Sequence, residues 1–184
     1  MPLSTLDTTS ALIVIDLQKG IVAIPTAHPA AEIIGRSVQL ARAFRERGLP
    51  VVLVNVTAGA PGRTDAGPHK FSFPDDWTDL VPELEQRPSD ILISKQRPGA
   101  FLGTSLDETL RRRGVTQIFL TGIATSAGVE STARSARDLG YNVVLVADAM
   151  TDRDAEVHRY YVEKIFPRNG EVTTTEEVLV QLPG

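Results

Sequence analysis

Three features that could carry out chemistry follow apolar runs of the sequence. Asp16 closes the run ALIVID, Lys95 follows DILIS, and the segment GIATSAG at 122–128 follows QIFLT. A buried carboxylate near a lysine has a pKa that its surroundings can tune for proton transfer. A turn leading from a strand into a helix offers backbone N–H groups to an anion or oxyanion. These features predict an acid/base site; a structural ion pair and an ordinary turn fit the same residues.

The segments that must position these residues alternate between two patterns. Short, uninterrupted apolar runs predict strands buried on both faces at 11–16, 51–56, 90–94, 117–121 and 142–147. The segments between them predict helices at 30–48, 104–113, 128–139 and 153–166. A short strand near 171–173 precedes a final helix. Thr104 with Asp107, and Thr174 with Glu177, are spaced as helix capping pairs.

This alternation predicts an α/β fold with a doubly wound parallel sheet covered by helices on both faces. Ligands of such sheets bind beyond the carboxyl ends of the strands, so the three features are expected to share one pocket. The long irregular segment 57–76, with Phe71, Phe73 and the neighbouring Trp77, is expected to wall that pocket. A surface loop without such a role is the alternative.

Composition excludes several classes of protein. The chain has 184 residues, of which 42% are hydrophobic and 23% charged, so a single domain spanning 1–184 is expected. A net charge of −4 without a basic tract argues against nucleic-acid binding. The absence of cysteine excludes disulfides and a thiol nucleophile. No signal-peptide pattern occurs, and no apolar run approaches about 18 residues, so we expect a cytoplasmic protein without membrane spans.

The histidines and glycines indicate neither a metal nor a nucleotide. His28, His69 and His158 lack metal-ligand spacing, and neither G-x-G-x-x-G nor a P-loop motif occurs. No cofactor is therefore expected, and the partner is expected to be a small-molecule substrate.

A different active site fits the stretch ATSAG. It is one residue away from G-x-S-x-G, the nucleophile elbow of α/β-hydrolases. Ser126, Asp148 and His158 then follow in the chain order of that catalytic triad. A serine hydrolase using Ser126 is therefore an alternative hypothesis.

Four stretches together resemble the isochorismatase-like hydrolases, a family that includes nicotinamidases, carbamoylases and isochorismatase. They are ALIVIDLQKG at 11–20, KQRPGAFLGTSL at 95–106, TGIATSAGVESTAR at 121–134 and VVLVADAMTD at 143–152. They occur in the family's order and span nearly the whole chain. The resemblance implies a three-layer α/β/α fold with a six-stranded parallel sheet in the order 3-2-1-4-5-6.

The resemblance also implies roles for individual residues. Most members use an Asp–Lys–Cys triad, in which Asp16 matches the acid and Lys95 the lysine. Ile123–Ala124 matches a cis peptide of the active-site loop, and the amides of Ala124 and Gly128 match the oxyanion hole. Gly128 stands where most members have their nucleophilic cysteine, so the resemblance is to the branch of the family with glycine in place of that cysteine.

This departure closes the thiol route, so water is the expected nucleophile. The resulting hypothesis is a hydrolase for a small polar metabolite, with Asp16 as acid or base and Lys95 as its partner. The residues expected to line the pocket are Gln18, Trp77, Phe101, Ile123 and Thr125. A non-catalytic or regulatory ligand-binding protein on the same fold is the alternative, and a homo-oligomer is expected from the relatives.

Overall fold

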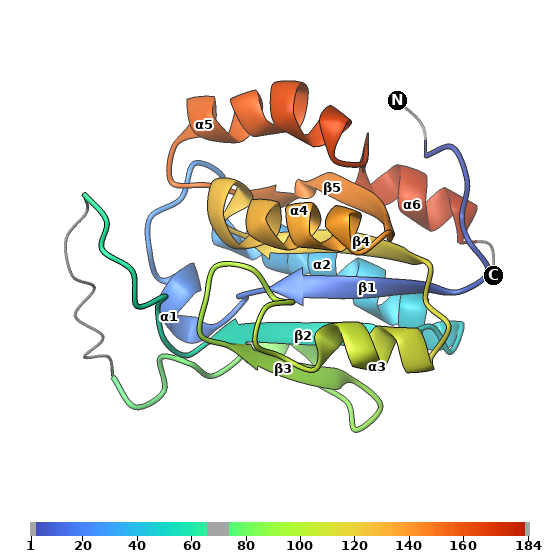
Figure 1. Cartoon of the computed structure of the whole chain (residues 1–184), viewed down its shortest axis with the longest axis horizontal. Helices are drawn as coiled ribbons and strands as arrows, with labels where there is room; N and C mark the ends of the chain where they lie inside the picture. The colour runs from blue at the N-terminus through green and yellow to red at the C-terminus, as the bar shows by residue number, and fades with distance from the viewer. Residues whose placement is uncertain (1–2, 66–73, 183–184) are drawn as a thin grey trace.

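The computed structural model describes residues 3–65 and 74–182, and a parallel sheet forms its centre (Figure 1). The sheet has six strands in the order β3-β2-β1-β4-β5-β6, and neighbouring strands pair in parallel. The strands are β1 Ser10–Ile15, β2 Val51–Val56, β3 Ile91–Lys95, β4 Gln117–Ile123, β5 Asn142–Thr151 and β6 Glu171–Thr173. The predicted order 3-2-1-4-5-6 is therefore confirmed.

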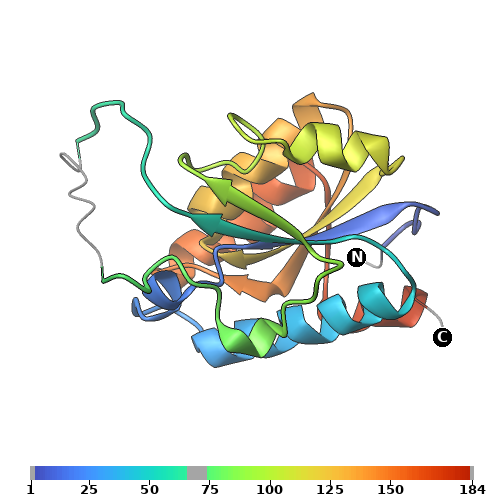
Figure 2. The same ribbon diagram turned by 90° about the horizontal axis from the view of Figure 1, so that it is seen from below.

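Helices cover both faces of this sheet and complete three layers (Figure 2). Helices α2 and α6 lie on one face, and α3, α4 and α5 lie on the other. The helices are α1 Lys19–Val22, α2 Ala30–Glu46, α3 Leu106–Arg112, α4 Glu130–Asp138, α5 Ala155–Tyr160 and α6 Thr175–Gln181. The predicted three-layer α/β/α architecture is confirmed.

Two hydrophobic cores separate the layers. Successive side chains of β1 point to opposite faces of the sheet. Leu12 and Val14 lie in the core on the α2 side, whereas Ile13 and Ile15 lie in the core under α3 and α4. Every residue of β1 is buried. Burial on both faces is the physical reason why residues 11–15 of this strand are all apolar.

One of the two predicted capping pairs is present. The Thr174 side chain accepts a hydrogen bond from Glu177 N, and the Glu177 side chain accepts one from Thr174 N, so α6 begins with a capping box. The pair predicted for Thr104 and Asp107 is wrong. The Asp107 carboxylate instead accepts a hydrogen bond of 2.7 Å from the Tyr141 hydroxyl, and α3 starts without a side-chain cap.

Strand β5 is longer than its apolar run. It continues to Thr151, and its pairing with β4 shifts register between Leu120 and Gly122. Asp148, expected after the strand, lies within it. The extension brings Thr151 and Asp152 to the edge of the sheet where β4 ends.

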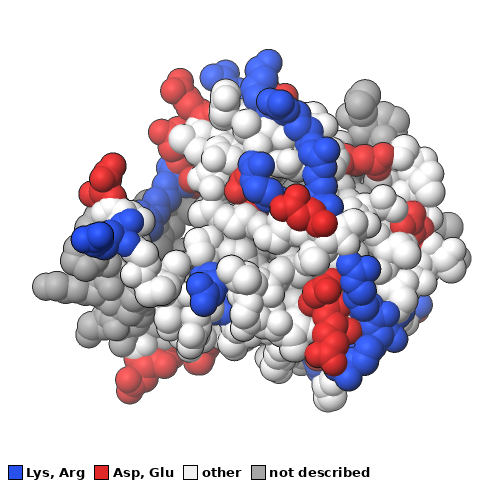
Figure 3. All heavy atoms as spheres, in the orientation of Figure 1, with Lys and Arg blue, Asp and Glu red and all other residues white. Residues whose placement is uncertain are grey.

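Charged side chains over α3 and α4 lie beside partners of opposite sign on the face drawn in Figure 3. These i,i+4 ion pairs are Arg111–Asp107, Arg112–Glu108 and Arg134–Glu130. Exposed pairs of this kind contribute little to stability. Among the helices of residues 3–65 and 74–182, none combines the length and apolar character needed to cross a bilayer.

Candidate active site

Asp16 and Lys95 meet at the carboxyl edge of the sheet. Asp16 directly follows β1, and Lys95 is the last residue of β3. The Lys95 Nζ donates a hydrogen bond of 2.7 Å to Asp16 Oδ2. Only 2% of the Lys95 side chain and 6% of the Asp16 side chain are exposed. The fold thus brings two residues far apart in the chain into one buried ion pair.

The surroundings of Asp16 favour proton exchange near neutral pH. Burial raises the pKa of its carboxyl group to about 6, and the charge and hydrogen bond of Lys95 limit that rise. The second carboxyl oxygen, Oδ1, is buried and has no hydrogen-bond partner among the described residues. Such a group can both take up and release a proton at physiological pH.

Close approach of β1 and β4 holds Asp16 in place. Asp16 has a φ of 52°, in the left-handed region that aspartate adopts more readily than most residues. On β4, a Cβ at Gly122 would lie 2.0 Å from the Ile15 carbonyl oxygen. Gly122 also has a φ of 114°. A residue without a side chain is therefore required there, and it lets Asp16 lie beside the turn that follows β4.

The turn after β4 forms the third part of the site. The peptide bond between Ile123 and Ala124 is cis, as the resemblance implied. A π-helical turn, Thr125–Val129, follows and leads into α4. Ser126 N donates a hydrogen bond of 2.7 Å to Asp152 Oδ2, which anchors this turn to the end of β5.

A cavity of about 880 Å³ opens beside these groups. The predicted site residues that line it are Asp16, Trp77, Lys95, Ile123, Ala124 and Gly128. Residues 58–60 and 62–64 also line it, so the described part of the irregular segment forms a wall of the cavity. Phe71 and Phe73, predicted to join that wall, lie outside the described residues.

Gln18 and Phe101, both predicted to line the pocket, are not among the described residues that do so. The Gln18 side chain bonds to both backbone groups of Val56 and donates to Trp77 O over 3.2 Å, so it braces the wall from behind. The Phe101 ring packs against Tyr141 in a hydrophobic core, with centroids 5.8 Å apart. These two predictions are wrong because both side chains point into the fold.

Thr125, the third incorrect pocket residue, also points away from the cavity. Its hydroxyl hydrogen-bonds with His158 Nδ1 over 2.8 Å, and the His158 ring meets His28 edge-on at a centroid distance of 4.9 Å. His28 Nδ1 lies 2.9 Å from Thr151 Oγ1. Burial, with a smaller effect from His28, holds the pKa of His158 below its usual range. This half-buried cluster, which is not part of the cavity lining, supports the turn through Thr125.

The Ser126–Asp148–His158 triad is not assembled. Ser126 lines the cavity, but the Asp148 carboxylate accepts hydrogen bonds from Thr175 N and Thr175 Oγ1 at the start of α6. His158 bonds with Thr125 and not with Ser126. The serine-hydrolase hypothesis is therefore wrong in its choice of both partners.

Asp152 is a site residue that the sequence analysis missed. It is buried, and its carboxylate accepts hydrogen bonds from Ser126 N and Arg153 N. Asp152 and Arg153 line the cavity together with Arg63 and Arg97. Asp152 is the last residue of VVLVADAMTD, one of the four stretches that resemble the isochorismatase-like hydrolases. Its place in that stretch is the signal that could have identified it as a residue of the site.

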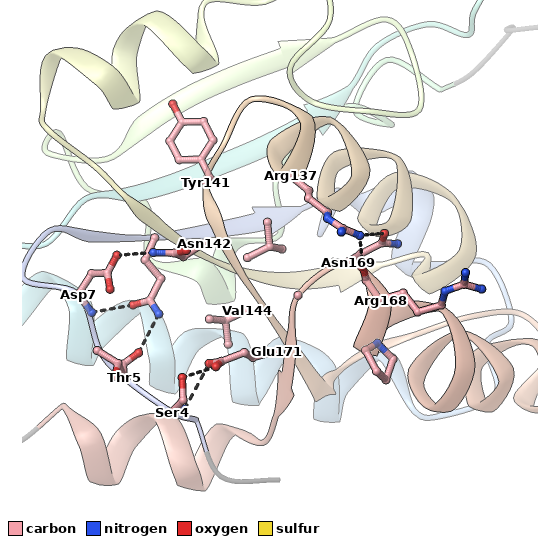
Figure 4. Close-up of a pocket in the computed structure, with 14 residues that line it drawn as sticks. Ser4, Thr5, Asp7, Arg137, Tyr141, Asn142, Val144, Arg168, Asn169 and Glu171 are labelled. Atoms are coloured by element: carbon pink, nitrogen blue, oxygen red, sulfur yellow. Dashed lines mark hydrogen bonds between the residues drawn. The ribbon is translucent and has the colours of Figure 1, made fainter.

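A second cavity, of about 410 Å³, lies at the opposite, amino ends of the strands, where β4, β5 and β6 begin (Figure 4). Its polar side chains bind one another: Asp7 accepts a hydrogen bond from Asn142, and Glu171 accepts one from Ser4. Across the described ranges, no group of three or more His, Asp or Glu residues is placed to hold a metal ion. The Asp16–Lys95 ion pair lines the other cavity, at the carboxyl ends of the strands.

Known proteins resemble this chain over most of its length. The family model described as Isochorismatase domain matches residues 10–177. The chain belongs to the isochorismatase family. It is 43% identical over 180 residues to the isochorismatase family protein YecD of Escherichia coli O157:H7, covering 93% of this chain and 95% of that protein. It is 33% identical over 178 residues to the ureidoacrylate amidohydrolase RutB of Variovorax paradoxus, covering 80% of this chain and 71% of that protein.

Solved structures share the same fold. An isochorismatase family protein from Burkholderia thailandensis matches with a TM-score of 0.94 at 40% identity, covering 98% of both chains. The N-carbamoylsarcosine amidase from Thermoplasma acidophilum matches with a TM-score of 0.77 at 26% identity, covering 92% of this chain and 98% of that chain. The chain therefore has an isochorismatase-family hydrolase fold with amidohydrolases among its relatives.

Gly128 lies directly beside the Asp16 carboxylate. The resemblance places a catalytic cysteine at this position, and the chain contains no cysteine at all. A Cβ built on Gly128 would lie 2.9 Å from Ile15 Cγ2 and 3.2 Å from Asp16 Oδ2. The space beside the carboxylate is thus too small for a side chain unless its neighbours move.

Gly128→Ala is expected to destabilise the protein by about 1–3 kcal/mol, the usual cost of overpacking a buried site. Gly35→Ala is the matched control, since Gly35 lies on α2 with no atom within 4 Å of an added Cβ. It is expected to stabilise the protein by roughly 0.5–1 kcal/mol. Urea unfolding measures both, and an equal effect of the two substitutions would contradict the tight packing at Gly128.

Proposed function

We propose that this protein hydrolyses a small polar metabolite at the Asp16–Lys95 pair, with water as the nucleophile. The observation that carries the proposal is a buried ion pair with a 2.7 Å hydrogen bond, facing a cavity of about 880 Å³. Burying two charges is costly, and a carboxyl group with a raised pKa in a ligand-sized cavity is typical of a catalytic site. Membership of a hydrolase family supports the reaction class.

Asp16 acts as the acid/base group. Because its pKa is about 6, its carboxyl group is largely ionised at pH 7 and takes a proton from the attacking water. The water oxygen bonds to the reacting carbon, and Asp16 then returns the proton to the leaving group. Lys95 stabilises the carboxylate, while the N–H groups of Ala124 and Gly128 stabilise negative charge developing on the substrate.

The relatives indicate which bonds to try first. Two of them are named as an amidohydrolase of ureidoacrylate and an amidase of N-carbamoylsarcosine, so amides and ureides come first. Vinyl ethers form the next panel, because their cleavage requires protonation by an acid and capture by water. Trp77 and Ile123 supply apolar surface for the part of the substrate that does not react.

The pH dependence of turnover tests this proposal. We expect kcat/KM on the best substrate of these panels to rise as the pH increases through about 6, because Asp16 must be ionised to accept a proton. A profile that falls through this pH would make Asp16 the acid instead of the base. A profile without any change near pH 6 would remove Asp16 from the mechanism, and no turnover on any panel would indicate a ligand-binding protein.

A further inference from the structure

We infer that the substrate carries an anionic group, a carboxylate or a phosphate, and that Arg97 and Arg153 bind it. This inference rests on the proposed function and names the substrate class of the same site. It follows from the charges that line the cavity, from the partners of those charges, and from where the two arginines lie relative to Asp16.

The cavity is more positive than the chain as a whole. Its basic side chains are Arg63, Lys95, Arg97 and Arg153, and its acidic side chains are Asp16 and Asp152. The described lining therefore has a formal charge of +2, whereas the whole chain has −4. A positive cavity on an acidic protein concentrates anions and lowers the local density of cations.

Neither acidic group of the lining neutralises an arginine side chain. The Asp16 carboxylate accepts its hydrogen bond from Lys95, and the Asp152 carboxylate accepts from the backbone N–H groups of Ser126 and Arg153. Within residues 3–65 and 74–182, the ion pairs do not include Arg63, Arg97 or Arg153. The remaining residues of the chain include no aspartate or glutamate. The arginines are thus available for a ligand.

Arg97 and Arg153 line the cavity from strands on opposite sides of β1. Arg97 follows β3, and its carbonyl oxygen accepts a hydrogen bond of 3.3 Å from Lys95 Nζ. Arg153 lies just after β5, and its backbone N–H group donates a hydrogen bond of 2.8 Å to the Asp152 carboxylate. The strand that leads to Asp16, β1, lies between β3 and β5, two strand spacings from each. That separation is about 10 Å, much of which an arginine side chain spans.

The guanidinium group suits this task. Its planar set of N–H donors matches the oxygens of a carboxylate or phosphate and forms two parallel hydrogen bonds. The backbone of Arg97 is bonded to Lys95 and that of Arg153 to Asp152, so both arginines start from positions coupled to the site. An anionic group held there would leave the reacting bond of the substrate near Asp16 and Gly128.

Isothermal titration calorimetry with malonate, succinate, inorganic phosphate and neutral succinamide tests the inference. We expect an anion to bind the wild-type protein at constant ionic strength and succinamide not to bind. Arg97→Gln/Arg153→Gln should weaken anion binding on the order of tenfold or more, the loss typical of hydrogen bonds to charged groups. Arg113→Gln is the control, because Arg113 lies at the C-terminal end of α3, away from the cavity lining, and it should bind like the wild type.

The relative affinities identify the anionic group. Tighter binding of a dicarboxylate assigns a carboxylate, and tighter binding of phosphate assigns a phosphate. Equal affinity in the double variant and the wild type, equal binding of succinamide, or no binding of any anion would overturn the inference.

The same variants separate this inference from the proposed hydrolysis. Asp16→Asn should still bind the anion, because the arginines remain. Arginine-dependent anion binding without turnover of any substrate would reject hydrolysis and keep the ligand class. Turnover with a KM that the arginine substitutions leave unchanged would reject the anionic substrate and keep hydrolysis.

Discussion

Replacing Asp16 with asparagine is expected to lower kcat by about 10²- to 10⁴-fold, the contribution typical of a general acid or base. Asparagine has nearly the same shape as aspartate, but its amide cannot take a proton from water and return it to a leaving group. The measurement is kcat at pH 7 on the best substrate of the amide, ureide and vinyl ether panels, expressed per folded molecule. A wild-type kcat in this variant would show that Asp16 has no chemical role.

Asp90→Asn controls for the loss of a buried ion pair. Asp90 pairs with Arg45 over 2.7 Å, and the two side chains are 1% and 4% exposed, so this pair is as buried as that of Asp16. It lies at the amino end of β3, whereas Lys95 lies at the carboxyl end. Asp90→Asn should therefore reduce stability and leave kcat per folded molecule unchanged. A similar fall of kcat in both variants would mean that the Asp16 effect is structural.

Replacing Lys95 with methionine is expected to destabilise the fold by about 3–5 kcal/mol at pH 8, because it leaves the Asp16 carboxylate buried and unpaired. The double variant Asp16→Asn/Lys95→Met removes both charges and should recover most of this loss. Urea unfolding of the wild type, both single variants and the double variant gives the coupling free energy. Purely additive losses would contradict a strong interaction between the two side chains.

The loss of folding stability in Lys95→Met should also be larger at high pH than at low pH. Folding raises the pKa of Asp16 from 3.8 to about 6, so the folded protein holds this proton more tightly than the unfolded chain. Protonation of Asp16 therefore stabilises the folded state at low pH, and this stabilisation is lost as the pH rises through 6. Without the lysine charge, which lowers this pKa, the folded-state pKa rises further. The variant should therefore be less destabilised at pH 5 than at pH 8. A loss that is the same at both pH values would contradict this origin.

The sheet and its helices followed from local patterns. Residues 11–15 and 51–54 are all apolar because both faces of β1 and β2 are covered there. A strand buried on both faces has an uninterrupted apolar sequence. Thr174 and Glu177 were sufficient to predict the start of α6, since a capping box involves neighbouring residues alone. The strand order came from the resemblance, because local patterns do not specify which strands pair.

Contacts between distant segments explain the errors. Asp107 was expected to cap α3, but its carboxylate accepts a hydrogen bond from the hydroxyl of Tyr141, which lies 34 residues further along the chain. Gln18 and Thr125 are polar residues close in sequence to Asp16 and Ala124, and this proximity predicted that their side chains face the cavity. Val56 and His158 satisfy them inside the fold instead, and no short-range pattern signals those partners.

The sequence by itself determined which chemistry the site can use: Asp16 and Lys95 each follow an apolar run, and no thiol exists in the chain. Only the tertiary structure decided that these two side chains lie 2.7 Å apart and that the pKa of Asp16 rises to about 6. Only the tertiary structure placed Arg97 and Arg153 around one cavity. Residue types are properties of the chain, whereas burial, proximity and electrostatic potential arise when segments remote in sequence pack together.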